Sequence, residues 1–177
     1  MKDELFDLVD REGNVIGQAP RSQCHANPAL IHQAVHVAVF NHASELFLQK
    51  RVPTKEIQPD KWDISVGGHV QAGEAPLAGA IRELREELGV ANAILTKAYE
   101  YIWESSIETE LIRTFVIVNE GPFILQADEI ADGRFWALDE IVATLPSGFA
   151  SPQFQHEFPQ LREWWKREQS RVLAITT

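Results

Sequence analysis

The chain has 177 residues, of which 45% are hydrophobic and 24% are charged, as in an ordinary globular protein. Its formal net charge of −10 argues against nonspecific binding to nucleic acid or to anionic membranes. The single cysteine, Cys24, excludes an intrachain disulfide, and no apolar run is long enough to span a membrane. We therefore expect one cytoplasmic domain over residues 1–177, whose acidic charge is compatible with a small phosphorylated ligand bound through a cation.

The first half of the chain predicts a hairpin followed by a buried strand. Apolar residues 5–9 and 15–17 flank a turn at 10–14, which is typical of a hairpin. The nearly continuous apolar run 33–40 indicates a strand covered on both faces, and 45–51 predicts its neighbour. Residues 65–68 form a glycine-rich strand end. The hairpin is expected to be an N-terminal extension of the domain.

The second half predicts a helix, three strands and two further helices. The first helix begins near Pro76 and ends at Gly89, with one apolar stripe formed by Leu77, Ile81, Leu84 and Leu88. Strands are predicted at 94–103, 111–118 and 134–138, and helices at 139–145 and 154–171, the last as a C-terminal extension. The pattern indicates an α/β (α+β) fold with a mixed β-sheet sandwiched between helices.

Three glutamates of the first helix are candidates for metal binding. Glu83, Glu86 and Glu87 are spaced i, i+3 and i+4, so their side chains share one helix face. Adjacent carboxylates repel one another unless a positive charge neutralises them, and an oxygen-only set suits Mg²⁺ or Mn²⁺ better than zinc. From these residues alone, a solvated acidic helix face remains the alternative.

The wider segment Gly68–Val90, GHVQAGEAPLAGAIRELREELGV, is identified as a complete Nudix box. The chain thus resembles Nudix hydrolases, which implies the Nudix fold and metal-assisted attack of water on a diphosphate linkage. The resemblance implies that Glu83, Glu86, Glu87 and the backbone at Gly68 hold Mg²⁺ or Mn²⁺. Arg82 would orient a box glutamate, while Glu74 and Gly89 would support the loop–helix geometry. The catalytic residues would be Glu83, Arg82 and Glu86, with Glu86 the first choice as general base and Glu129 the second.

The flanks of the box resemble a narrower branch, type I isopentenyl-diphosphate isomerase. Its metal site of three histidines and two glutamates is matched by His25, His32, His69, Glu108 and Glu110. This mixed donor set suits Mn²⁺, Zn²⁺ or Fe²⁺ and would form a second metal site. The basic residues that hold diphosphate in that enzyme are matched by Arg21, Arg51 and Lys55.

Two departures count against isomerase activity. The catalytic cysteine of the isomerase is replaced by Gly67, and the Nudix box, which is usually degraded in isomerases, is intact. We therefore expect a diphosphate hydrolase, with an isomerase-like enzyme and an inactive diphosphate-binding module as alternatives. A homodimer stays open, since Trp164 and Trp165 suit packing or a dimer contact. His36, Trp62, Trp103 and Phe115 are expected in the core, and His42 and His156 are given no role.

Overall fold

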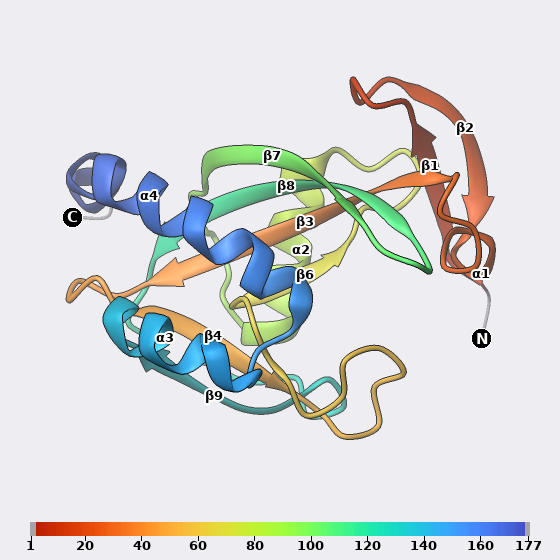
Figure 1. Ribbon diagram of the computed structural model, residues 1–177. Coiled ribbons are helices and arrows are strands. Elements are labelled where there is room, and N and C mark those ends of the chain that lie inside the picture. Colours follow the sequence, from red (N-terminus) through yellow and green to blue (C-terminus); the bar gives the residue numbers. More distant parts are fainter. Residues whose placement is uncertain (1–2, 176–177) are drawn as a thin grey trace.

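The structure, a computed structural model, describes residues 3–175 (Figure 1). Within that part of the chain, nine strands form one mixed sheet. The strands are β1 (Leu5–Val9), β2 (Val15–Pro20), β3 (Ile31–Phe40), β4 (Leu46–Arg51), β5 (Trp62–Asp63), β6 (Val66–His69), β7 (Thr96–Glu104), β8 (Thr109–Val118) and β9 (Ile130–Trp136). The helices are α1 (Arg21–Cys24), α2 (Pro76–Leu88), α3 (Leu138–Thr144) and α4 (Pro152–Ile175), with a 3₁₀ turn η1 (Leu145–Ser147). The mixed sheet with helices confirms the predicted fold class.

Strand β3 is the centre of the sheet. It pairs in parallel with β8 over ten residues and antiparallel with β6, while β7 joins β8 and β9 joins β4. Every β3 residue after Ile31 is buried, as the continuous apolar run predicted. Because side chains alternate along a strand, Val35, Val37 and Val39 pack on one face, and Ala38 and Phe40 pack on the other.

Helices cover the two faces of this sheet. Figure 1 shows α4 crossing one face and α2 lying behind the strands, and each helix has its own apolar core. On the α4 side, the ring of Trp165 stacks on Phe40 with centroids 3.8 Å apart, and Trp164 is buried beside it. The two tryptophans therefore pack within the chain, which explains them without a dimer contact.

Helix α2 is rotated relative to the predicted apolar stripe. Leu77 is 46% exposed, so the prediction that it faces the core is wrong. The buried line runs through Ala80, Leu84 and Leu88 and includes Glu87. Spacing alone favoured the larger apolar side chains, whereas the helix turns the small side chain of Ala80 and the carboxylate of Glu87 towards the sheet.

Several strands begin at other residues than the sequence predicted. Strand β7 begins at Thr96 rather than at Ile94, which is 70% exposed, and β9 begins at Ile130, four residues before the predicted start. The short α1 and β5 were not predicted, because elements of four and two residues are too short to show periodicity. Among the described residues, no helix is long and apolar enough to span a membrane.

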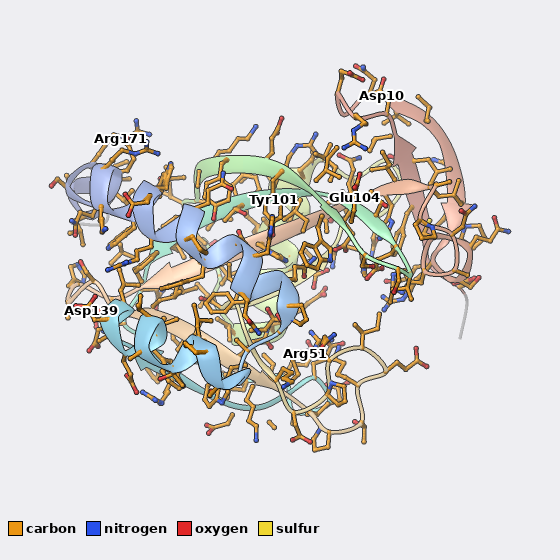
Figure 2. The ribbon with its side chains drawn as sticks, viewed as in Figure 1. Asp10, Arg51, Tyr101, Glu104, Asp139 and Arg171 are labelled. Carbon is orange, nitrogen blue, oxygen red and sulfur yellow. The ribbon has the colours of Figure 1, made fainter. Side chains whose placement is uncertain are left out.

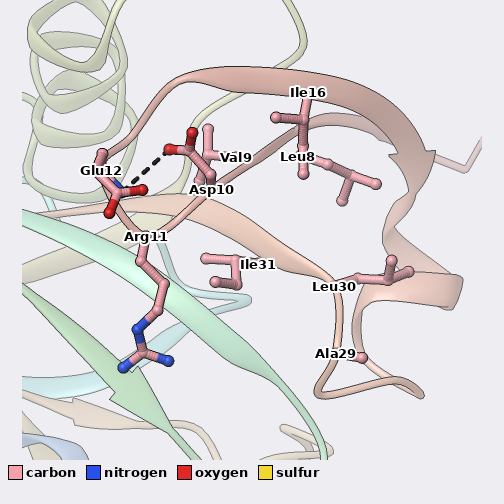
Figure 3. Close-up of a pocket in the computed structure, with 9 residues that line it drawn as sticks. All are labelled: Leu8, Val9, Asp10, Arg11, Glu12, Ile16, Ala29, Leu30 and Ile31. Atoms are coloured by element: carbon pink, nitrogen blue, oxygen red, sulfur yellow. Dashed lines mark hydrogen bonds between the residues drawn. The ribbon is translucent and has the colours of Figure 1, made fainter.

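The N-terminal hairpin lies beside the central strand. Its turn is fixed by Asp10, whose carboxylate accepts hydrogen bonds from the backbone N–H of Glu12 (Figure 3) and from that of Asn14. The hairpin and the segment before β3 form a small hollow of about 360 Å³, which contains no box residue. Pairing of Leu8 with His32 joins the hairpin to β3. The hairpin thereby reaches the candidate site described next.

Candidate active site

A cavity of about 590 Å³ brings the two predicted groups of polar residues together. Strand β6, helix α2, the 52–61 loop and the β7–β8 turn all contribute to its walls. Of the residues predicted from the sequence, the lining includes Gly68, Arg82, Glu83 and Glu86 from the box, the cluster residues His25, His69, Glu108 and Glu110, and Arg21, Arg51, Lys55 and Glu129. Figure 2 shows Arg51 where β4 meets the 52–61 loop.

Arg82 is the hub of the box. Its Nε and Nη2 donate to the two carboxylate oxygens of Glu74, each over 2.9 Å, and Nη2 also donates to the carbonyl of His69. Its Nη1 donates to Glu83 over 2.7 Å and to Glu86 over 3.3 Å. One planar guanidinium thus ties the loop before α2, the end of β6 and two box glutamates together.

At Gly68, the backbone of β6 lies directly against the carboxylate of Glu83. A Cβ atom at this position would overlap the carboxylate of Glu83. Only glycine therefore leaves room for the Glu83 side chain against the β6 backbone. Burial raises the pKa of Glu83, although the hydrogen bond from Arg82 opposes that shift. The pair forms a tight oxygen-lined corner of the cavity.

Glu87 and Glu86 differ sharply in environment. Glu87 is 2% exposed, and it accepts a hydrogen bond from Gln49 on β4 over 2.8 Å. Burial, with the nearby charge of Glu83, raises the pKa of Glu87 well above its ordinary value. The side chain of Glu86 is 45% exposed and forms an ion pair with Arg82 at 3.3 Å. Glu86 is the more open of the two towards solvent.

The three residues predicted to bind the diphosphate line the same cavity, and each is held by a different partner. Lys55 donates to Glu129 over 2.7 Å. Arg51 is held by the carbonyl of Ile57, to which both Nε and Nη2 donate. Arg21 pairs with Glu4 at 3.3 Å. These cations thus lie around one cavity whose remaining lining is rich in carboxylates.

The histidines and glutamates from the second resemblance also converge. His25, His32, His69 and Glu108 each offer a ligand atom, and these atoms all lie within 4.8 Å of one another. Glu108 Oε2 is 3.2 Å from His25 Nε2. Glu110 Oε1 is 3.3 Å from His69 Nε2, and Glu110 Oε2 accepts a hydrogen bond from Gln153 on α4. The parallel register of β3 and β8 places His32 opposite Glu110.

Several buried polar atoms of the histidine–glutamate cluster lack a hydrogen-bond partner within the described chain. Both ring nitrogens of His32 and Oε2 of Glu108 are buried with no hydrogen-bond partner within the described chain. Buried polar atoms without a hydrogen-bond partner lower the stability of the folded state, so a group of such atoms requires an explanation. A divalent cation among them would supply the missing interactions, because neutral imidazole and carboxylate are both metal ligands.

Burial sets the protonation of the cluster. Burial lowers the pKa of both His25 and His32 to about 4, with the charge of His69 adding to the shift. Burial and the adjacent Glu110 raise the pKa of Glu108, whereas the His69 hydrogen bond holds the pKa of Glu110 below its usual range against burial. The two histidines are therefore neutral at pH 7, the state in which imidazole binds metals.

Some site residues gave no recognisable signal in the sequence. Phe6 of the hairpin stacks on the rings of His32 and His69 with centroids 5.3 and 4.8 Å away, so an apparent extension forms one wall of the cluster. Trp103 was expected in the core, but it lines the cavity. His36 is buried as expected, yet it also lines the cavity. Short-range patterns do not reveal contacts between distant segments, so these roles needed the structure.

Comparisons with known proteins identify a matching family, similar sequences and a similar structure. Residues 30–164 match the NUDIX domain family. The chain is 36% identical to the uncharacterized Nudix hydrolase PA4841 of Pseudomonas aeruginosa over 75% of this chain and 78% of that one. It is 35% identical to an isopentenyl-diphosphate Delta-isomerase of Streptomyces avermitilis over 77% of this chain and 73% of that one. The structure of DR0079 from Deinococcus radiodurans has the same fold, with a TM-score of 0.78 at 23% identity over 89% of this chain and 98% of that one.

The two sequence relatives have nearly equal identity, so overall similarity does not separate a hydrolase from an isomerase. The family match covers the central strand, the Nudix box and most of α4. Together with the arginine hub and the glutamates around it, that match shows that this chain belongs to the Nudix family, as a Nudix-type hydrolase.

Proposed function

We propose that this chain hydrolyses a diphosphate linkage in a small nucleoside-diphosphate-type substrate, with Mg²⁺ or Mn²⁺. The observation that carries the proposal is the arrangement of Arg82, Glu83 and Glu86 in the wall of a cavity that also contains Arg51 and Lys55. Carboxylates on one side and cations on the other suit a substrate whose phosphates are bridged to the protein by a divalent ion.

The box residues fit such an ion. Glu83, Glu86 and Glu87 supply oxygen donors, and the missing side chain at Gly68 brings the β6 backbone close to Glu83. Glu87 is buried without a cationic hydrogen-bond partner in the described residues, which suits a carboxylate awaiting a metal. When bound, the metal would neutralise charge on the phosphates and lower the pKa of a bound water.

The remaining steps fall to side chains of this chain. Arg82 would keep Glu83 and Glu86 in fixed positions, since it donates to both. Glu86, the more exposed of these glutamates, would accept the proton of the attacking water. Glu129 is the second choice, because its carboxylate is already paired with Lys55.

The three basic residues would hold the outer phosphate oxygens. Arg51 presents a guanidinium already oriented by the Ile57 carbonyl, so little side-chain freedom would be lost on binding. Lys55 and Arg21 would exchange their carboxylate partners for phosphate. These contacts would bring positive charge to the substrate in an acidic protein.

A second divalent ion would bind at His25, His32, His69, Glu108 and Glu110. The unpartnered atoms of His32 and Glu108 support this assignment, and the mixed nitrogen and oxygen donors suit Mn²⁺, Zn²⁺ or Fe²⁺. The same cluster favours a second candidate function, isomerisation of an isoprenoid diphosphate. The intact box and the absence of a thiol at Gly67 favour hydrolysis instead.

The test is a product assay with metal variation. Purified protein is incubated with Mg²⁺ or Mn²⁺ and a panel of nucleoside diphosphates and triphosphates, dinucleotides and nucleotide sugars, and phosphate products are separated. Isopentenyl diphosphate is included, with double-bond migration followed by NMR. Hydrolysis of at least one panel compound supports the proposal. Migration without hydrolysis would establish the isomerase, and ligand-dependent stabilisation without any product would establish a binding module.

A further inference from the structure

A second buried polar network lies beside the cavity, centred on His36 and Glu157. His36 stands on β3 opposite Gly67 of β6 and Thr114 of β8. Its ring is 4% exposed, and Nδ1 lies 2.6 Å from Oε2 of Glu157 on α4. None of the box or cluster interactions described above involves this pair. His36 nevertheless forms part of the cavity wall.

Glu157 is held as an anion. Besides His36, its carboxylate accepts hydrogen bonds from the hydroxyls of Thr114, Tyr99 and Tyr101. Figure 2 shows Tyr101 next to α4. Four donors favour the ionised form, and a buried anion requires a cationic partner. Among the described groups bonded to Glu157, only His36 can carry positive charge. Burial opposes that charge, but Glu157 and the neighbouring carboxylates together raise the pKa of His36.

The imidazolium has one proton left to donate. Nδ1 is used by Glu157, whereas no described residue forms a hydrogen bond with Nε2. The neighbouring Gly67 leaves the ring edge open, because a Cβ there would lie 3.2 Å from Cδ2 and 3.5 Å from Nε2 of His36. A nine-tenths buried ring thus has an unpartnered donor at a cavity wall, which indicates that a ligand atom completes it.

The surroundings of His36 indicate what kind of acceptor fits. Asp63 and Glu110 both act on the ring through their charge, and both line the cavity. Further anionic oxygens would be repelled there, so a neutral acceptor is favoured. Trp103 adds an indole ring to the same lining. A planar heterocycle with a carbonyl oxygen or ring nitrogen matches a cavity whose lining includes both such a donor and an aromatic side chain.

We propose that His36, oriented by Glu157, donates a hydrogen bond from Nε2 to a neutral acceptor on a nucleobase of the substrate. This inference rests on the proposed function, because it places the base of the substrate in the cavity where the diphosphate is cleaved. His36 is then a specificity-determining residue: it reads the organic group, while the box and the basic residues act on the phosphates.

The test compares substrates with and without a base. Nucleoside diphosphates contain the acceptor, and methyl diphosphate keeps the anhydride but lacks it. Gly67→Ala is the main variant, because the added methyl group would lie against the Cδ2–Nε2 edge of the His36 ring, whereas Glu157 is bonded to Nδ1. His36→Leu removes the donor but leaves Glu157 without its cation, so its melting temperature is measured first. Gly17→Ala is the matched control, since a Cβ there meets only Leu8 at 4.0 Å.

We expect Gly67→Ala to lower kcat/KM for the preferred nucleoside diphosphate about 10- to 100-fold, mostly through KM, as for loss of a hydrogen bond to a charged donor. Turnover of methyl diphosphate should change less than about threefold. Equal losses on both substrates would overturn the proposal, because they would place the defect in the box. Unchanged kinetics on both would overturn it as well.

A binding measurement separates this proposal from the proposed function. Thermal stabilisation by each nucleoside diphosphate is measured in wild type and in Gly67→Ala. If wild type hydrolyses no compound but is stabilised by nucleotides, and Gly67→Ala loses that stabilisation, the His36 site stands while the hydrolase assignment falls. If no nucleotide stabilises wild type, or if both proteins are stabilised equally, the His36 proposal falls.

Discussion

The guanidinium of Arg82 meets the carboxylate of Glu74 in a two-pronged ion pair, with both N–O distances at 2.9 Å. The hydrogen bond from Arg82 lowers the pKa of Glu74, so the pair stays charged through neutral pH. Glu74 lies in the loop before α2, and Arg82 lies within the helix. The pair therefore fixes the direction from which Arg82 approaches Glu83 and Glu86.

The geometry predicts that Arg82→Lys is not a conservative change. A lysine cannot donate two parallel hydrogen bonds to Glu74 while also reaching Glu83. We expect kcat to fall at least about tenfold, since catalytic groups tolerate little displacement. Steady-state kinetics would measure the loss. Arg85→Lys on the same helix is the control and should leave kcat unchanged. A wild-type rate in Arg82→Lys would show that the hub is dispensable.

The identity of the general base can be decided by paired amide substitutions. Glu86→Gln should lower kcat by about 10²- to 10⁴-fold, the range typical of losing a general base, whereas Glu129→Gln should cost less than about tenfold. Both are measured at saturating Mn²⁺, so that weaker metal binding does not mask the comparison. Glu163→Gln, exposed on α4 and paired with Lys166, is the control. The reverse ranking would assign the base to Glu129.

Gly68→Ala should disturb the box through sterics alone. The added methyl group would overlap the Glu83 carboxylate, so that side chain must move. We expect the apparent Kd for Mn²⁺, measured by electron paramagnetic resonance, to rise at least about tenfold. The Gly17→Ala variant should bind Mn²⁺ like wild type. Unaltered Mn²⁺ affinity in Gly68→Ala would separate Glu83 from the metal site.

His25 and His32 should each make the metal-free protein less stable as pH falls from 6.5 to 4. Their pKa values are lowered to about 4, so at these two sites the unfolded chain binds more protons than the folded one in this window. Raised pKa values of carboxyl groups, including Glu83, Glu87 and Glu108, act in the opposite sense, so the histidine contribution is measured as a difference from a variant. Urea unfolding in EDTA at each pH compares wild type with His25→Gln, whose stability relative to wild type should rise as pH falls. A difference in unfolding free energy that stays constant from pH 6.5 to 4 would contradict this account.

Trp165→Ala should destabilise the fold without changing the chemistry. The ring is 1% exposed and stacks on Phe40, so its removal leaves a large cavity between α4 and the sheet. We expect the free energy of unfolding to fall by about 3–5 kcal/mol. Denaturant titration provides the value, and kcat measured well below the transition should match wild type. A loss under about 1 kcal/mol would mean that this contact contributes little.

Local sequence was sufficient for the long elements and for the box. The apolar run of β3 and the spacing of the box glutamates depend on neighbours within one strand or helix, where periodicity is informative. The orientation of α2 was not predictable, because a small residue, Ala80, faces the core while Leu77 points outward. The rotation of α2 about its axis is set by packing against the sheet and not by the positions of its large apolar residues.

The resemblance to the isomerase suggested the histidine–glutamate cluster, but the contacts of Glu157 and Phe6 could not be predicted. Glu157 lies in a helix whose pattern gives no sign of a buried carboxylate, and its partner His36 looks like any strand residue. Phe6 became part of the cluster only because the hairpin pairs with β3. Such contacts depend on tertiary packing, which one sequence does not display.

The ten-residue parallel pairing of β3 with β8 also has a consequence for how the protein reaches its native state. His32 and Glu110 become neighbours only when two strands from opposite halves of the chain align, and a slip of one residue would send every side chain to the other face. Parallel pairing between strands so far apart in the sequence forms late, because the entropic cost of closing the long intervening loop comes before the favourable contacts between the strands. The histidine–glutamate cluster therefore assembles only when folding is complete. A metal bound there would stabilise the finished register and would not act as a folding nucleus.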